Sequence, residues 1–191
     1  MSLNTPNALN VSAGKPAVGG AIFVAPLGTS LPTTVSGSLA EGFKALGYVS
    51  DDGLSNNNAP TTNSVKAWGG DTVLTLQTDR PDTFAFTLIE VLNEDVLKTV
   101  YGAENVEVDA SGNISVKATA EELPGYAWVV DMIVRGGRAK RIVIPNGTIS
   151  DLGEITYKDD EATGYALTIT DVPDSTGVYH YEYIQGAEIS G

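Results

Sequence analysis

The sequence VKAWGGDTVLTLQTDRPDTFAFTLIEVLNEDVLKTVYG, residues 65–102, decides the fold of this chain. Within it, residues 73–78 and 83–90 predict two strands that turn back on each other at residues 78–82, where Asp, Arg and Pro interrupt the apolar pattern. The second strand has large apolar side chains at every other position: Phe84, Phe86 and Leu88. This period of two is typical of a strand with one face in a core.

A short helix is expected directly after these strands. Asn93 is a favourable N-cap, and Glu94 and Asp95 complement the helix dipole in the first turn. The apolar residues that follow fall on one face of a helix: Val96, Leu97, Val100 and Tyr101. Gly102 suits the left-handed conformation that commonly ends a helix.

The second half of the chain is expected to be nearly all strand. The expected strands are residues 114–118, 126–135, 138–144, 165–170 and 179–183. Residues 126–135 are apolar on both faces, so this strand is either central in a sandwich or covered by a helix or a neighbouring subunit. The run Pro145-Asn146-Gly147 predicts a hairpin turn, and the irregular pattern near Gly153 predicts a β-bulge.

The region before residue 65 contains two more expected elements and a long loop. Residues 21–25 form a short apolar run, consistent with a strand buried on both faces. A capping box of Ser38 and Glu41 predicts a second short helix that ends at Gly47. Residues 50–64 are rich in turn-forming residues and predict a long loop.

Length and composition predict one compact domain. The chain has 191 residues, of which 42% are hydrophobic and 18% charged, and this composition argues against a disordered chain. We expect an N-terminal arm at residues 1–17 and a single domain at residues 18–191. The absence of cysteine excludes disulfides and thiolate chemistry. No signal peptide or membrane span is visible, so synthesis in a cytoplasm is expected.

Residues suited to catalysis or metal binding are scarce. The chain has one histidine, His180, with no motif around it, and a structural or surface role is expected for it. The acidic run at residues 159–161 lacks the alternating ligands of a calcium loop, which favours a solvated turn. We therefore expect no enzyme and no catalytic, cofactor-binding or metal-binding residue. A hydrolase with two carboxylates is an alternative that needs a deep acidic pocket.

The charge of the chain is strongly acidic. It has 24 acidic and 11 basic residues, a net charge of −13, which excludes binding to nucleic acid through a generally basic surface. Four basic residues gather around one turn: Arg135, Arg138, Lys140 and Arg141. They suit contact with DNA or with carboxylates of a neighbouring subunit, and the acidic composition favours the second.

Four stretches, in order, resemble the major tail tube proteins of long-tailed bacteriophages of the siphophage type. They are VGGAIFVAPLGTSLP (18–32), GFKALGYVSDDG (42–53), the stretch 65–102 quoted above and RIVIPNGTISDLGEITYKDDEATGYALTITDVPD (141–174). The resemblance implies an α+β, mainly β fold: a sandwich or barrel of antiparallel strands with one or two short flanking helices. It also implies a structural virion protein that self-assembles into stacked rings, the tail tube through which DNA is ejected.

The resemblance also implies partners. The ring is expected to be a hexamer that stacks into a tube and contacts tape-measure and tail-terminator or tail-tip proteins. Double-stranded DNA passes through the lumen without specific binding, and an acidic lumen would keep it from sticking. The subunit is made in the host cytoplasm and belongs to the virion, with no membrane contact.

In tail tube proteins, a long loop or hairpin in this region of the chain reaches neighbouring subunits. Residues 50–68 are therefore the expected assembly loop, with these candidate contacts: Asp51, Asp52, Asn56, Asn57, Asn58, Lys66 and Trp68. Trp68 suits an interfacial anchor, and the alternative is a surface loop with Trp68 in the home core. The alternative function is a carbohydrate- or receptor-binding β-sandwich of a virion or cell surface, which predicts an exposed aromatic cleft.

Overall fold

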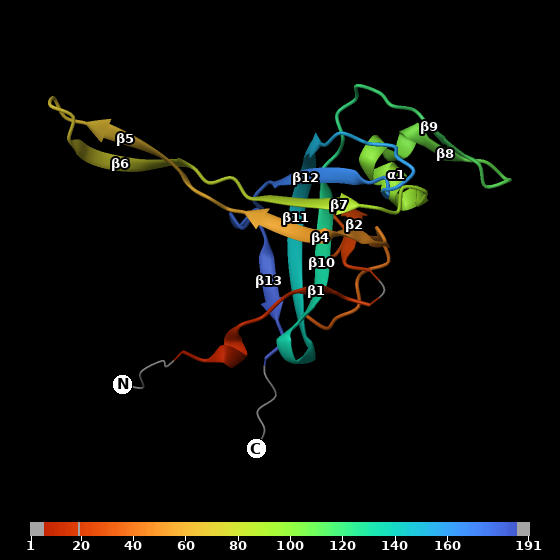
Figure 1. Cartoon of the computed structure of the whole chain (residues 1–191), viewed down its shortest axis with the longest axis horizontal. Helices are drawn as coiled ribbons and strands as arrows, with labels where there is room; N and C mark the ends of the chain where they lie inside the picture. Colours follow the sequence, from red (N-terminus) through yellow and green to blue (C-terminus); the bar gives the residue numbers. More distant parts are fainter. Residues whose placement is uncertain (1–5, 19, 187–191) are drawn as a thin grey trace, which may run out of the picture.

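The computed structural model describes residues 6–18 and 20–186, and it consists mainly of antiparallel strands (Figure 1). A sheet of nine strands forms the body, and the helix α1 packs at one end of it. Two separate ribbons, each of two strands, project from opposite sides of the body. The expected mainly β, α+β fold is confirmed, and the sheet does not close into a barrel.

The strands of the main sheet lie in one order from edge to edge. That order is β3 (Lys44–Ala45), β2 (Ile22–Pro26), β10 (Tyr126–Val134), β11 (Arg138–Leu152), β12 (Tyr165–Asp171), β7 (Thr83–Leu88) and β4 (Val49–Asn57). Two short strands complete the sheet: β1 (Lys15–Pro16) pairs with β10, and β13 (Tyr181–Ile184) pairs with β11.

The long hairpin of β10 and β11 lies in the middle of the main sheet. On its other side β10 pairs with β2 and β1, while β11 pairs with β13 and β12. Both strands therefore have partners on each side within the same chain. Both faces of β10 are covered, because the neighbouring residues Trp128 and Val129 are each 0% exposed, which agrees with the apolar pattern of residues 126–135. The strand order ends at β3 and β4.

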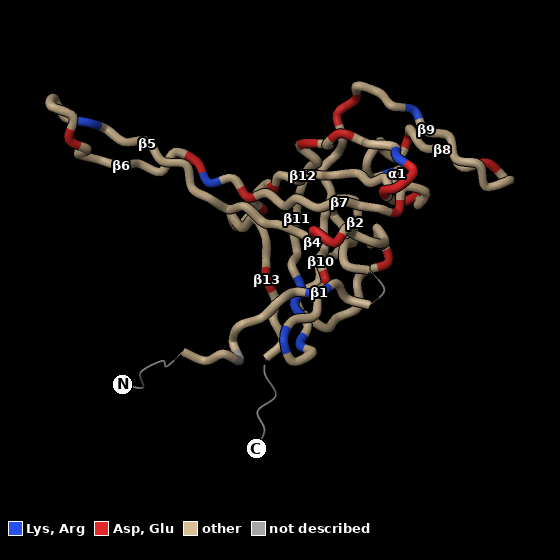
Figure 2. The backbone as a smooth tube through the Cα atoms, viewed as in Figure 1, with Lys and Arg blue, Asp and Glu red and all other residues tan. Residues whose placement is uncertain are grey.

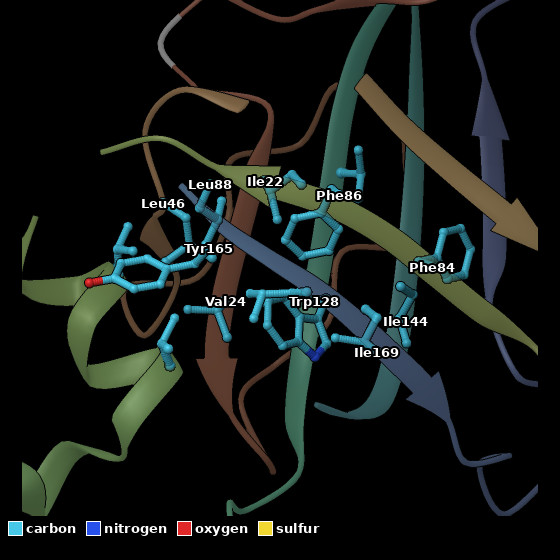
Figure 3. Close-up of a cluster of buried hydrophobic side chains, with 14 of the residues drawn as sticks. Ile22, Val24, Leu46, Phe84, Phe86, Leu88, Trp128, Ile144, Tyr165 and Ile169 are labelled. Atoms are coloured by element: carbon cyan, nitrogen blue, oxygen red, sulfur yellow. The ribbon is translucent and has the colours of Figure 1, made fainter. Parts of the chain in front are cut away.

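The core lies inside the curled sheet and beneath α1 (Figure 3). Trp128 on β10 is fully buried, and its indole Nε1 donates a hydrogen bond of 2.9 Å to the carbonyl oxygen of Gly147. Strands β7 and β12 alternate as expected and bury six large side chains: Phe84, Phe86, Leu88, Tyr165, Leu167 and Ile169. Burial of each such side chain contributes roughly 1.5–3 kcal/mol.

The helix α1 (Glu94–Tyr101) begins and ends as expected. The Asn93 side chain accepts a hydrogen bond of 3.0 Å from the Asp95 backbone N–H. Gly102, at φ 92°, ends the helix by donating from its backbone N–H to the Lys98 carbonyl oxygen. The face that α1 turns toward the sheet buries Val96, Leu97 and Val100. Three short 3-10 turns also occur: η1 (Ala8–Asn10), η2 (Ala103–Asn105) and η3 (Arg135–Gly137).

Two ribbons project from the body, and the first of them takes the place of two expected features. The first consists of β5 (Thr61–Lys66) and β6 (Thr72–Asp79), and the second of β8 (Val106–Val108) and β9 (Ile114–Val116). The expected hairpin at residues 78–82 is wrong, because β6 pairs with β5 whereas β7 pairs with β12 and β4. The expected loop at residues 50–64 is also wrong, since β4 and β5 occupy most of it.

The expected helix after Ser38 is wrong as well. Residues 38–43 are irregular apart from a turn at residues 41–42, and the chain then enters β3. Contacts from the body hold this segment, because Arg141 Nη1 donates to the carbonyl oxygens of Thr34 and Gly37 at 3.2 and 2.8 Å. The capping box is a local preference, and these tertiary contacts outweigh it.

The expected turn at Pro145-Asn146-Gly147 does not form, and β11 runs straight through it. The register shifts there, because Trp128 lies opposite Ile144 whereas Tyr126 lies opposite Gly147. This shift is a β-bulge, a position where the missing N–H of proline costs little. A second shift lies between Ile149 and Asp151, slightly before the bulge expected near Gly153. The last strand begins at Tyr181 instead of residue 179.

Candidate assembly surfaces

The ribbon of β5 and β6 extends beyond the body, and every residue of both strands is exposed (Figure 1). Val65 lies opposite Leu74, and Asn63 lies opposite Leu76, so these residues share one face of the ribbon. Val65, Leu74 and Leu76 are 44%, 49% and 49% exposed. We call this apolar face, together with Trp68, the hairpin surface.

The opposite face of the same ribbon is mainly polar, although it also carries Val73, which is 62% exposed. Ser64 lies opposite Thr75, and their hydroxyl oxygens are 3.4 Å apart. Because successive side chains of a strand point to opposite faces, Thr75 and Gln77 lie on the face away from Leu74 and Leu76. The ribbon therefore has one apolar and one mainly polar side, as a strand pair covered on one side by protein would have.

Trp68 lies at the tip of this ribbon and is fully exposed, with a relative accessibility of 106%. The tip is a tight turn in which the Ala67 N–H donates to the Asp71 carbonyl oxygen at 2.8 Å. Gly69 and Gly70 adopt φ angles of 114° and 102°, which only glycine adopts without strain. The alternative that buries Trp68 in the home core is excluded.

The root of the ribbon is held by side chains that were expected to contact neighbours. The Asn56 Nδ2 donates to Asp82 Oδ1 at 2.6 Å, and the Arg80 Nε donates to Asn58 Oδ1 at 2.5 Å. The Asn57 carbonyl oxygen accepts from the Thr83 hydroxyl at 3.4 Å. These three asparagines therefore fix the root within their own chain. Three of the other candidates are exposed: Asp51, Asp52 and Lys66.

The four basic residues lie together at the far end of the β10–β11 hairpin, where Figure 2 shows the largest group of Lys and Arg. Arg135 donates from Nη1 to the Ala8 carbonyl oxygen at 2.7 Å, which holds the N-terminal segment. Arg138 donates from Nε to the Arg135 carbonyl oxygen at 3.2 Å. Lys140 pairs with Glu182 at 2.9 Å.

Arg141 differs from the other three because it is buried, with 5% exposure. Its guanidinium makes a two-pronged ion pair with Asp131, at 2.6 and 2.7 Å. Together with the carbonyl oxygens of Thr34 and Gly37, this pair occupies the donors of Arg141 inside its own chain. Arg135 is the exposed member of this cluster, whereas Arg138 and Lys140 are half-buried.

A profile of the phage tail tube protein family matches residues 7–187. The match covers most of the chain and includes both ribbons and the whole described sheet. The chain belongs to the phage tail tube protein family. A comparison of the sequence with curated proteins found no match.

Membership of this family makes the chain a structural protein of the phage tail that self-assembles into a tube with other tail proteins. The carbohydrate- or receptor-binding alternative gains no support from it. Within residues 6–18 and 20–186 of the tail tube subunit, no helix is long and apolar enough to cross a membrane.

His180 of the tail tube subunit lies just before β13 and faces a buried carboxylate. Its Nδ1 contacts the Asp82 carboxylate, and its ring packs edge-on against Phe84 with centroids 5.2 Å apart. Asp171 lies beside this pair, and burial, followed by the charge of Asp82, raises the pKa of Asp171 to about 8. Asp82 and Asp171 are 0% and 4% exposed, so this pair of carboxylates has no open pocket for a sugar chain.

Sequence reasoning did not bring Asp82 and Asp171 together. They meet because β12 pairs with β7 in a register that puts Ile169 opposite Phe84, so the end of one strand lies beside the start of the other. Their separation along the chain gives no local signal. The signal that was present is the placement of each aspartate at the end of an alternating apolar strand.

Proposed function

We propose that the tail tube subunit joins its neighbours through the hairpin surface, which packs its apolar face against a second copy of the chain in a stacked ring. The observation that carries the proposal is the exposed apolar face formed by Val65, Leu74 and Leu76. A ribbon of two strands is only marginally stable alone in water, so a partner that covers this face stabilises it. Trp68 at the tip suits an anchor, because tryptophan is enriched where interfaces are most tightly held.

The free energy available from this contact is small for one pair of subunits, which suits an assembly in which every subunit makes the same contact. Full burial of a Val or Leu side chain contributes roughly 1.5–3 kcal/mol, and these three side chains are already about half covered. The hairpin surface therefore offers about 2–4 kcal/mol per subunit, before Trp68 is counted. A contact of this size is weak for one pair of subunits and strong when every subunit of a ring makes it at once.

The ring in this proposal is a hexamer with an acidic lumen. A hexamer carries 6 × −13 = −78 formal charges, which the contacts between subunits must offset. The exposed Arg135 and the half-buried Arg138 support a role in that compensation, opposite carboxylates of a neighbour. Negative charge on the lumen would repel the phosphates of double-stranded DNA and let it pass without specific binding. Tape-measure and tail-terminator or tail-tip proteins complete the set of proposed partners.

Two double variants on one strand test the role of the hairpin surface. Leu74→Ser with Leu76→Ser removes the apolar face, whereas Thr75→Ala with Gln77→Ala changes the opposite face of the same ribbon. We expect the first pair to abolish tubes in negative-stain microscopy and the second pair to leave them. Circular dichroism should show both variants folded. Tubes of normal length and number from the leucine variant would refute the proposal.

A shortened ribbon gives a second test that removes Trp68 as well. Thr61 lies opposite Asp79, so replacing residues 62–78 by Asn-Gly closes the ribbon with a two-residue turn that suits paired strands. The body keeps all of its pairing, because β4 and β7 are untouched. The expected product is a folded subunit that stays unassembled in sedimentation at concentrations where the full chain forms tubes.

A further inference from the structure

A cluster of three side chains that can bind a metal ion lies at the root of the ribbon. Asp82, Asp171 and His180 each direct one ligand atom to the same place, and these atoms lie within 4.8 Å of one another. Asp82 precedes β7, Asp171 ends β12, and His180 precedes β13. Among the described residues, this is the group of such side chains close enough to share one ion.

The carboxylate of Asp171 is buried without a hydrogen-bond partner. Asp171 is 4% exposed, and neither of its carboxylate oxygens has a partner among the described residues. Asp82 is satisfied, because its Oδ1 accepts from Asn56 and its Oδ2 contacts His180. Leaving a buried carboxyl group without a hydrogen-bond partner is costly, and the Asp171 group lies close to two other ligand atoms, so the arrangement suits a cation.

We propose that Asp82, Asp171 and His180 bind one divalent transition-metal ion, with Zn²⁺ as the best match. An imidazole nitrogen with two carboxylates is a ligand set that zinc and its neighbours accept, whereas calcium and magnesium prefer oxygen alone. Zinc ligands lie about 2.0–2.2 Å from the ion, so two of them are at most about 4.4 Å apart, close to the spread in this cluster. The ion takes the place of the proton between His180 and Asp82, and its charge balances the two carboxylates.

Further contacts hold the ligands in place. The Asn56 Nδ2 donates to Asp82 Oδ1 at 2.6 Å, which orients this carboxylate as outer partners of metal ligands commonly do. The Asp171 backbone N–H donates to the Asp82 carbonyl oxygen at 2.9 Å, and Phe84 packs against the His180 ring. These contacts bring together the end of β4, the link from β6 to β7, the end of β12 and the approach to β13. A bound ion would therefore tie the root of the ribbon to the body.

Metal titration of the purified, unassembled subunit tests this site without reference to tube formation. After treatment with a chelator and its removal, Zn²⁺ alone is titrated by calorimetry, with Ca²⁺ in a parallel sample. We expect one saturable Zn²⁺ site per subunit and no comparable Ca²⁺ site. At 100 times the dissociation constant, Zn²⁺ should raise the melting temperature by about 5–10 °C.

Variants assign the binding to the cluster. Asp171→Asn keeps the shape of the side chain and removes the carboxylate that would ligate the ion, so we expect a folded subunit that binds Zn²⁺ at least about 100-fold more weakly. Asn56→Ala, which leaves all three ligands in place, should weaken binding by about 10-fold to 100-fold. Asp160→Asn, in the exposed acidic turn, is the control and should bind like the unchanged chain.

Three results would overturn the proposal: no saturable Zn²⁺ binding to the unchanged chain, equal binding to the Asp171→Asn variant, or loss of binding in Asp160→Asn alone. If Asp171→Asn fails to fold, Asn56→Ala and His180→Gln are titrated with Zn²⁺ in its place. Weaker binding in both variants supports the site, and unchanged binding in both overturns it. Because all of these measurements use the unassembled subunit, they can fail while the hairpin surface still drives assembly, and the reverse also holds.

Discussion

Strands β6 and β7 are neighbours in the sequence, joined by residues 80–82, and both place apolar residues at alternate positions. In β7 the alternate side chains are buried, whereas all eight residues of β6 are exposed. Of these two strands, β7 has a face covered by its own chain and β6 has none. Local alternation therefore does not indicate whether the chain itself covers the apolar face, and for β6 we propose that a neighbouring subunit does.

The largest expected effect comes from removing one apolar side chain from each strand. Phe86→Ala should lower the free energy of unfolding by about 3–5 kcal/mol, because it opens a cavity in the core. Leu76→Ala, on the exposed face of β6, should change it by less than about 0.5 kcal/mol in the unassembled subunit. Urea unfolding of both variants below the assembly concentration measures this. A large loss in Leu76→Ala would mean that the body of its own chain covers the ribbon.

An intermediate effect is expected at two glycines with nearly the same backbone. Gly47 and Gly53 have φ angles of 71° and 73°. A side chain at Gly47 overlaps the Glu90 carboxylate, which accepts from the Tyr48 N–H at 2.9 Å, whereas one at Gly53 meets nothing within 4 Å. Gly53→Ala should cost about 1 kcal/mol through backbone strain, and Gly47→Ala about 2–3 kcal/mol.

Thermal unfolding of the two glycine variants isolates the effect of the neighbour, since the strain is common to both. Equal losses would show that Glu90 moves aside freely. As with β6 and β7, two positions that look alike locally differ in what surrounds them. At the two glycines, the surrounding groups decide how much stability the new side chain costs.

The smallest effect is expected from salt. With a net charge of −13 on each subunit, screening over about 8–10 Å at physiological ionic strength should promote association through the hairpin surface. Light scattering across a salt series should show a modest rise for the unchanged chain. The Leu74→Ser, Leu76→Ser variant should show none, because it lacks the apolar face. Association that weakens steadily with salt would instead assign the contact to ion pairs.

Features set by neighbouring residues were predictable from the sequence. The alternation of β7 and β12, the start of α1 at Asn93 and its end at Gly102 each follow from a few adjacent positions. The mainly β fold and the family followed from the same stretches.

Features set by distant contacts were not predictable. Arg141 holds the carbonyl oxygens of Thr34 and Gly37, and no local pattern near Ser38 reveals that contact. The bulge that accommodates Pro145 depends on its opposite strand, β10. A long loop was expected at residues 50–64, and the paired strand β5 was missed there because its polar sequence, TTNSVK, also suits a loop. Asp82 and Asp171 meet only through the register of β7 and β12.

The order of strands in the sheet also has a consequence for the chain as it is synthesised. β5 and β6 pair across a short turn, so the ribbon can form as soon as residue 79 has emerged. The body forms later, because β2 pairs with β10 and β7 pairs with β12, and both partner strands are synthesised after residue 125. A nascent chain thus exposes the apolar face of the β5–β6 ribbon before the rest of the domain has folded. Lower temperature during expression weakens apolar association and should therefore raise the yield of soluble subunit, whereas crowded polysomes favour premature association.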